Sequence, residues 1–77
     1  MAIRKMIEQR MEVVGCDGAH VGIVEQVEDT NEIRLAKDDP DAGGEEHYIP
    51  LDWLVHTEIK VHLKLPADEA KARWTTH

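Results

Sequence analysis

The sequence predicts a single, mainly β domain over residues 1–77: a small antiparallel β-barrel of about five short strands with a short C-terminal helix. Three observations predict this fold. An Asp-Gly pair separates two apolar runs, apolar and charged residues alternate between positions 59 and 65, and a proline then opens an alanine-rich segment. Short apolar runs divided by turn residues are typical of small barrels.

The Asp17-Gly18 pair predicts the first hairpin. Residues 11–15 and 20–28 are rich in β-branched and other apolar side chains, as strands are. Asp followed by Gly suits a two-residue hairpin turn, in which both central residues take positive φ. The apolar residues of the second strand are spaced three apart, so we expect a bulge or bend near Gly22 that turns them all inward. They are Val21, Val24 and Val27.

Turn residues and alternation place the next elements of the barrel. Pro50 is expected to end a strand, because proline cannot donate to a strand ladder. The expected order is a turn at 29–32, a strand that includes Ile33 and Leu35, an exposed acidic loop at 38–46, an extended segment at 47–50 and a short turn at 51–54.

The most regular stretch of the chain comes near its end. From residue 58 to residue 65, apolar positions alternate with charged ones and a histidine, which predicts one half-buried strand with Ile59 pointing inward. Pro66 then opens ADEAKARW, where acids come early and bases late, as in a helix matched to its dipole. The expected plan is a short helix or a loose tail at 1–10, the barrel at 11–65 and a helix at 66–75.

Charge and cysteine content narrow the classes of function. The net charge is −7, from nine Lys and Arg against sixteen Asp and Glu, so phosphate backbones and anionic membranes are repelled. The longest apolar run falls far short of the ~20 residues that cross a bilayer, and no apolar stretch of a signal peptide follows the N-terminal basic residues. The lone cysteine, Cys16, fits a reducing compartment. We expect a cytoplasmic, bacterial-type protein with no nucleic-acid partner and no membrane insertion.

Two motifs resemble the PRC-barrel domain: DG.HVG.V..V, which begins at Asp17, and IPLDW, which ends at Trp53. The terminal EAKARW is similar to that of a narrower group of short, single-domain bacterial proteins of unknown function. The resemblance implies a noncatalytic barrel that docks on protein partners or on itself. It also implies that the matched residues are structural, with glycines that shape the turn and bend and apolar residues that fill the core. These residues are Asp17, Gly18, Gly22, Ile49, Pro50 and Trp53.

No constellation of catalytic residues is evident in the sequence. The chain contains no serine, and its carboxylates fall in turns or in the acidic loop. An EF-hand reading that starts at Asp39 places Pro50 where the bidentate Glu belongs, and the histidines lack HxH or HExxH spacing. We therefore predict no enzyme activity, no cofactor and no metal site. The ligands that a metal would use are His47, His56, Asp39 and Asp41.

The sequence favours a protein-interaction module that binds itself or another protein. A chain of 77 residues has a modest core and no disulfide, so self-association is a source of extra stability. The residues proposed for the contact are Met6, Ile7, Met11, Leu54 and Trp74. The alternative is a metal- or ligand-responsive protein that uses His47, His56 and the 38–46 loop.

Overall fold

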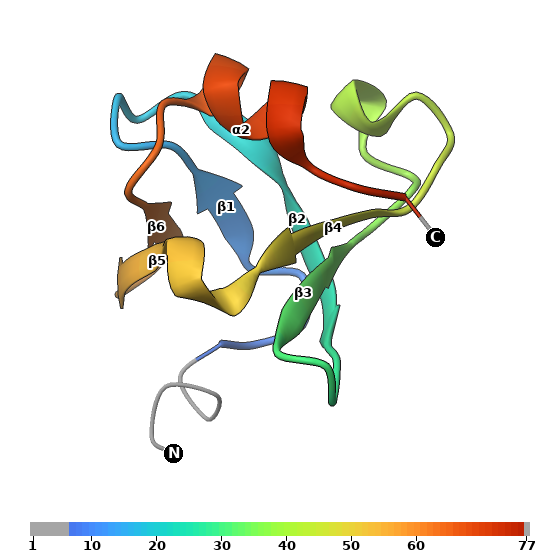
Figure 1. Ribbon diagram of the computed structural model, residues 1–77, viewed down its shortest axis with the longest axis horizontal. Coiled ribbons are helices and arrows are strands. Elements are labelled where there is room, and N and C mark those ends of the chain that lie inside the picture. Colours follow the sequence, from blue (N-terminus) through green and yellow to red (C-terminus); the bar gives the residue numbers. More distant parts are fainter. Residues whose placement is uncertain (1–6, 77) are drawn as a thin grey trace.

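The computed structural model describes residues 7–76, in which six strands form one mixed sheet and one α-helix packs against it (Figure 1). The strand order is β4-β3-β2-β1-β6-β5. The mainly β class and the C-terminal helix are confirmed. The elements are β1 (Glu12–Val14), β2 (His20–Val27), β3 (Glu32–Leu35), the 3₁₀-helix η1 (Pro40–Ala42), β4 (His47–Pro50), the 3₁₀-helix η2 (Leu51–Trp53), β5 (Leu54–Thr57), β6 (Val61–Leu63) and α2 (Ala67–Arg73).

The closed antiparallel barrel of about five strands is not confirmed. Within residues 7–76, the end strands β4 and β5 do not pair, and η2 joins them along the chain instead. One pairing is parallel: Val13 and Val14 of β1 lie opposite Val61 and His62 of β6. Parallel neighbours need a long crossover connection, and β2 to β5 supply it here. The result is a twisted sheet that curves around its core and stays open (Figure 1).

The first hairpin turn has three residues instead of the expected two. The Gly15 N–H donates to the Ala19 carbonyl, and the Gly18 N–H donates to the Gly15 carbonyl, both at 2.9 Å. The third position of such a loop takes positive φ, and Gly18 has φ 81°, whereas Asp17 has no positive φ. Asp17 instead accepts hydrogen bonds from the N–H groups of Ala19 and Ala67, so it ties the turn to the start of the helix.

The turn between β2 and β3 repeats this design. The Glu28 N–H donates to the Glu32 carbonyl at 2.7 Å, and the Asn31 N–H donates to the Glu28 carbonyl at 3.2 Å. Asn31 fills the third position with φ 62°. Asparagine adopts this left-handed conformation more readily than most residues with a side chain. The turn expected at 29–32 is confirmed, with strand β3 already resuming at its last residue.

Two bulges in β2 account for the valines spaced three apart. Opposite β1 the extra residue is Val21, and opposite β3 it is Glu25. Each bulge shifts the alternation of the strand, so the next apolar side chain again faces the core. The expected inward orientation is confirmed, since Val21 and Val24 are buried and Val27 packs against the core cluster. The first bulge lies beside Gly22, as predicted.

Two glycines are required by close packing. A Cβ on Gly15 would overlap the backbone nitrogen of Ala67 and lie 2.8 Å from the Leu65 carbonyl oxygen. A Cβ on Gly22 would lie 3.0 Å from Cδ1 of Leu35, a side chain that can shift. The Gly22 contact agrees with the structural role expected there. Sequence reasoning gave Gly15 no such role, although Gly15 is where β1 meets the connection from β6 to α2.

The prediction of one strand over residues 58–65 is wrong. Strand β5 ends at Thr57, and the chain reverses through a turn in which the Glu58 N–H donates to the Lys60 carbonyl at 3.0 Å. Ile59 lies in this turn and is 87 % exposed, although it was predicted to point inward. Only residues 61–63 form the expected strand, as β6. The turn contains no glycine, proline or asparagine, so the alternating pattern continues through it without a break.

The acidic 38–46 segment is more ordered than an exposed loop. It contains η1, whose N-cap Asp39 accepts a hydrogen bond from the Asp41 N–H at 3.3 Å. Asp39 and Ala42 are both buried. Gly43, with φ 66°, then ends η1 in the left-handed conformation typical of a helix C-terminus. Only part of the segment therefore faces water.

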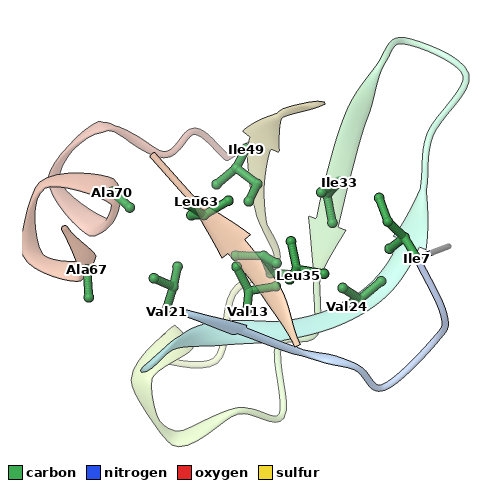
Figure 2. Packing of buried hydrophobic residues seen from close by; sticks show 11 residues of the cluster. Ile7, Val13, Val21, Val24, Ile33, Leu35, Ile49, Leu63, Ala67 and Ala70 are labelled. Atoms are coloured by element: carbon green, nitrogen blue, oxygen red, sulfur yellow. The ribbon is translucent and has the colours of Figure 1, made fainter. Parts of the chain in front are cut away.

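The core lies between the curved sheet and helix α2 (Figure 2). Ile49 fills it as expected, and Pro50 ends β4. Trp53 is only partly buried and packs at the margin of the cluster. Within residues 7–76, no helix has the length and apolar character needed to cross a bilayer. The buried cluster consists of Ile7, Val13, Val21, Val24, Ile33, Leu35, Ile49, Val61, Leu63, Ala67 and Ala70.

The short helix or loose tail expected at 1–10 lies mostly outside the described residues, which begin at residue 7. Residues 1–6 lie outside the described residues. Residues 7–10 contain a turn and no helix, and Ile7 is buried in the core. The Met11 N–H donates to the Glu8 carbonyl at 3.2 Å, and Arg10 has φ 72°. Residues 7–10 therefore pack against the fold through Ile7.

Candidate functional site

The β5–β6 hairpin, residues 54–63, carries the exposed large apolar side chains of the described chain. Val55 is 58 % exposed and Ile59 is 87 % exposed. Val55 is the bulged residue of β5, and Ile59 lies in the turn that follows. A bulge redirects its side chain out of the regular alternation. The hairpin therefore presents apolar surface at the end of the sheet, although its sequence predicted a buried face.

Three side chains that can ligate a metal gather on the same hairpin. His56 of β5 and His62 of β6 are opposite one another in the ladder, and their rings stack with centroids 4.4 Å apart. Glu58 follows β5, and its carboxylate and the two imidazoles offer ligand atoms that all lie within 4.8 Å of one another. Of these three residues, only His56 was named as a metal ligand from the sequence. The signal available in the sequence is the close spacing of His56 and Glu58, although the turn that returns His62 to them could not be predicted from it.

A second charged cluster surrounds His20. Its Nδ1 atom lies 2.8 Å from Oε2 of Glu12, and its Nε2 atom lies 2.7 Å from Oδ2 of Asp39. Burial lowers the pKa of His20, but the two carboxylate hydrogen bonds outweigh burial, and the pKa is raised. The hydrogen bond from His20 in turn lowers the pKa of Glu12, with help from Lys60. Both ring nitrogens are thus engaged in holding three segments of the fold together.

His47, a metal ligand named from the sequence, lies inside the fold. Its Nε2 atom is 2.8 Å from the Ala42 carbonyl oxygen, and its ring stacks on Trp74 with centroids 3.9 Å apart and planes at 11°. The other ring nitrogen is buried and has no hydrogen-bond partner among residues 7–76. His47 therefore connects η1, β4 and the end of α2, and it is not open to an ion from solvent.

Asp39 and Asp41, the other metal ligands named from the sequence, also do not join His56 in one site. Asp39 is bonded to His20, and Asp41 accepts a hydrogen bond from Lys71 of α2 at 2.9 Å. That hydrogen bond lowers the pKa of Asp41. In the described part of the chain, His56 is the only one of the four that belongs to a cluster with metal-ligating geometry. The structure does not bring together the His47, His56 and 38–46 combination.

The residues predicted for a contact surface mostly pack inward. Met6 lies outside the described residues. Ile7 is 8 % exposed and belongs to the core. Met11, Leu54 and Trp74 are partly buried and pack against the core cluster. None of these four described residues is among the exposed large apolar side chains of the chain.

A surface hollow of about 290 Å³ lies beside β4 and the C-terminal segment. Its lining is polar and mixed in charge, with neither histidine nor cysteine. Carboxylate, amine and hydroxyl side chains line it, without the histidine or cysteine of a nucleophile–histidine pair. The lining residues are Lys37, Glu45, Glu46, Tyr48 and Thr76.

Comparisons with known proteins identify a family and no activity. The family described as an uncharacterized protein conserved in bacteria (DUF2171) matches residues 7–71, which is most of the chain. No curated protein matches, and no solved structure matches. The family description names no substrate, ligand or partner. We therefore infer the function from the geometry of the hairpin and of the histidine clusters.

Proposed function

The chain belongs to the bacterial DUF2171 family, and from this premise we propose that it is a noncatalytic protein-interaction module that associates with a second copy of itself. The β5–β6 hairpin makes the contact, with Val55 and Ile59 at its centre. The observation that carries the proposal is the 87 % exposure of Ile59 in a turn. Turns are normally built from polar residues and glycine, and apolar surface left open on a small domain is typical of a contact site.

The two ends of the sheet support the choice of β5. At the β4 end, the Tyr48 N–H donates to the Thr75 carbonyl at 2.7 Å, and the Thr75 N–H donates to the Tyr48 carbonyl at 3.0 Å. The C-terminal segment therefore covers that edge. At the other end, β5 pairs only with β6 among residues 7–76. Among the described residues, the β5 end of the sheet is therefore the more accessible of the two to a partner.

Charge supports a second copy as the partner. The chain as a whole carries a net charge of −7. Residues 54–64, in contrast, contain the two lysines Lys60 and Lys64 and the single acid Glu58. Two copies that approach through their hairpins thus meet less electrostatic repulsion than the net charge of the whole chain would give. Contact through any acidic face would bring like charges together.

The geometry of the hairpin favours a two-fold arrangement. An isologous contact places the same patch of each copy against the other, so that Ile59 of one copy meets Val55 of the other. The bulge at Val55 interrupts the regular ladder of β5 and hinders a continuous intermolecular sheet. The contact therefore consists mainly of apolar side chains, with few backbone hydrogen bonds.

The contacts of the reactive side chains support a noncatalytic role, because most of these side chains are bonded within the fold or buried. His20 and Asp39 hold each other, and His47 is stacked and buried. Cys16 is a free thiol, exposed at a hairpin turn. A free, exposed thiol also supports a reducing, cytoplasmic setting.

We further propose that the fold is a PRC-type barrel opened between β4 and β5. The order of the elements, the bulged strand around Gly22 and the turn that follows Pro50 support this relationship. The family resemblance adds docking on a protein partner as the expected role, which agrees with the exposed hairpin.

Sedimentation equilibrium tests the proposed self-association. In EDTA and at high micromolar concentration, the wild-type chain is expected to have twice the mass of one chain. The double variant Val55→Thr with Ile59→Ser should be monomeric, because it keeps the turn and removes the apolar patch. The matched control is Ala72→Ser on the exposed face of α2, which should behave as wild type. A monomeric wild type, or a dimer that the double variant leaves intact, would overturn the proposal.

A further inference from the structure

We infer that the β5–β6 hairpin holds a divalent transition-metal ion, with zinc as the best fit, between His56, Glu58 and His62. The inference does not depend on the proposed self-association. The ligand atoms of the three side chains already lie within 4.8 Å of one another. The two histidines are opposite partners in a ladder, with ring planes at 14°, so the backbone holds both imidazoles on the same face.

The distances suit closure around a small ion. Zinc is bound by nitrogen and oxygen at about 2.0–2.2 Å in tetrahedral geometry, so neighbouring ligand atoms stand roughly 3.3–3.5 Å apart. The three ligand atoms need to approach one another by at most about 1.5 Å to reach that spacing. His56 and Glu58 are exposed and His62 is only partly buried, so rotations of their side chains can supply this movement.

The polar atoms of these residues are free for a metal. Within residues 7–76, the side chains of His56, Glu58 and His62 form no hydrogen bond or ion pair, and only the two rings touch. In contrast, His20 is bonded at both ring nitrogens. The neighbouring Lys60 is drawn toward Glu12 at 3.4 Å, so its charge is satisfied elsewhere. The three side chains therefore offer metal ligands that form no hydrogen bond or ion pair with another group of the described chain.

The donor set selects the class of metal. Two imidazoles and one carboxylate suit zinc and similar divalent transition ions, whereas calcium and magnesium prefer oxygen ligands alone. Three protein ligands leave one tetrahedral position for water or another donor. An ion here would also link β5 to β6 and restrain the turn between them, which contains Ile59.

Calorimetric titration of the untagged chain with zinc chloride tests the site. We expect one zinc per chain with micromolar affinity, and no heat of binding with magnesium or calcium chloride. His56→Gln, Glu58→Gln and His62→Gln should each weaken binding by about tenfold or more, since even partners outside the metal's direct ligands contribute this much. Glu45→Gln, an exposed acid elsewhere, is the matched control and should bind as wild type.

Two further readouts keep the test decisive. Far-UV circular dichroism establishes that each variant is folded, as expected for side chains at the surface. NMR of the histidine rings then locates the ion, because zinc should shift the resonances of His56 and His62 and leave those of His47 and His20 unchanged. Absence of stoichiometric binding, or binding that survives all three substitutions, would overturn the inference.

Discussion

His20 and Asp39, which are 19 residues apart in the sequence, form a short contact of 2.7 Å between Nε2 and Oδ2. The Asp39 side chain is only 4 % exposed, and Glu12 contacts the other ring nitrogen of His20. A buried carboxylate is costly unless it is paired and hydrogen-bonded. The His20 imidazole therefore links β1, β2 and the start of η1, and its protonation should contribute to the stability of the fold.

The first prediction is that this contribution has a defined pH window. The pKa of His20 is raised from 6.5, so its stabilising effect is complete below 6.5 and is lost as the pH rises through the raised value. The pKa of Glu12 is lowered from 4.5, so its effect is present above 4.5 and is lost as the pH falls through the lowered value. The cluster should stabilise the fold most between these two ordinary values.

Urea denaturation of His20→Gln across this range measures the effect. At about pH 5.5 the variant should lose about 1.5–3 kcal/mol of unfolding free energy, the usual value of hydrogen bonds to charged groups. The loss should shrink as the pH rises through the raised pKa of His20, where the wild-type imidazole becomes neutral. His56→Gln in EDTA is the control with no carboxylate hydrogen bond. A loss that is constant with pH would contradict the assigned role of protonation.

The second prediction ranks three glycine substitutions by the atoms that a methyl group would meet. Gly15→Ala should cost more than about 3 kcal/mol, at the upper end for overpacking, because the new Cβ meets fixed backbone. Gly22→Ala should cost about 1 kcal/mol, because a Leu35 side chain can move aside. Gly18→Ala meets no atom but keeps a φ of 81°, which costs about 1–2 kcal/mol. Chemical denaturation gives all three values, and a Gly15 variant as stable as the Gly22 variant would refute the packing described.

The third prediction separates Ile49 and Ile59, which were both expected to point inward, Ile49 from the family resemblance and Ile59 from the alternating pattern. Ile49 is fully buried opposite Ile33, so Ile49→Ala should cost about 2–5 kcal/mol. Ile59 is exposed, so Ile59→Ala should change the unfolding free energy of the monomer by less than about 0.5 kcal/mol. Thermal or urea unfolding at low protein concentration checks both. A large loss of unfolding free energy from Ile59→Ala would contradict the exposed turn and would instead indicate a buried Ile59 in one continuous strand over residues 58–65.

Local signals in the sequence predicted the elements that depend on nearby residues. The Asp17-Gly18 turn, the inward valines of β2 and the helix after Pro66 follow from turn chemistry, bulges and dipole matching. The sequence could not reveal the reversal at Glu58, because Ile59 continues the apolar alternation through a turn that lacks glycine and proline.

Contacts between distant residues account for the rest. The pairing of β1 with β6 and the His20–Asp39 contact join segments that are far apart in the chain, and no periodic pattern encodes such partners. The cluster of His56, Glu58 and His62 was missed for a related reason, since it needs the same unforeseen turn to bring His62 back. The sequence shows which side chains can ligate a metal or form an ion pair, but it does not show which of them meet in the fold.

The dilution dependence of amide NMR shifts tests the central claim most directly. If two copies meet through the β5–β6 hairpin, raising the protein concentration in EDTA should shift the amides of residues 54–60 progressively and leave those of α2 and η1 in place. The Val55→Thr, Ile59→Ser chain should show no such change. Shifts that are independent of concentration, or that map to another face of the sheet, would contradict the account.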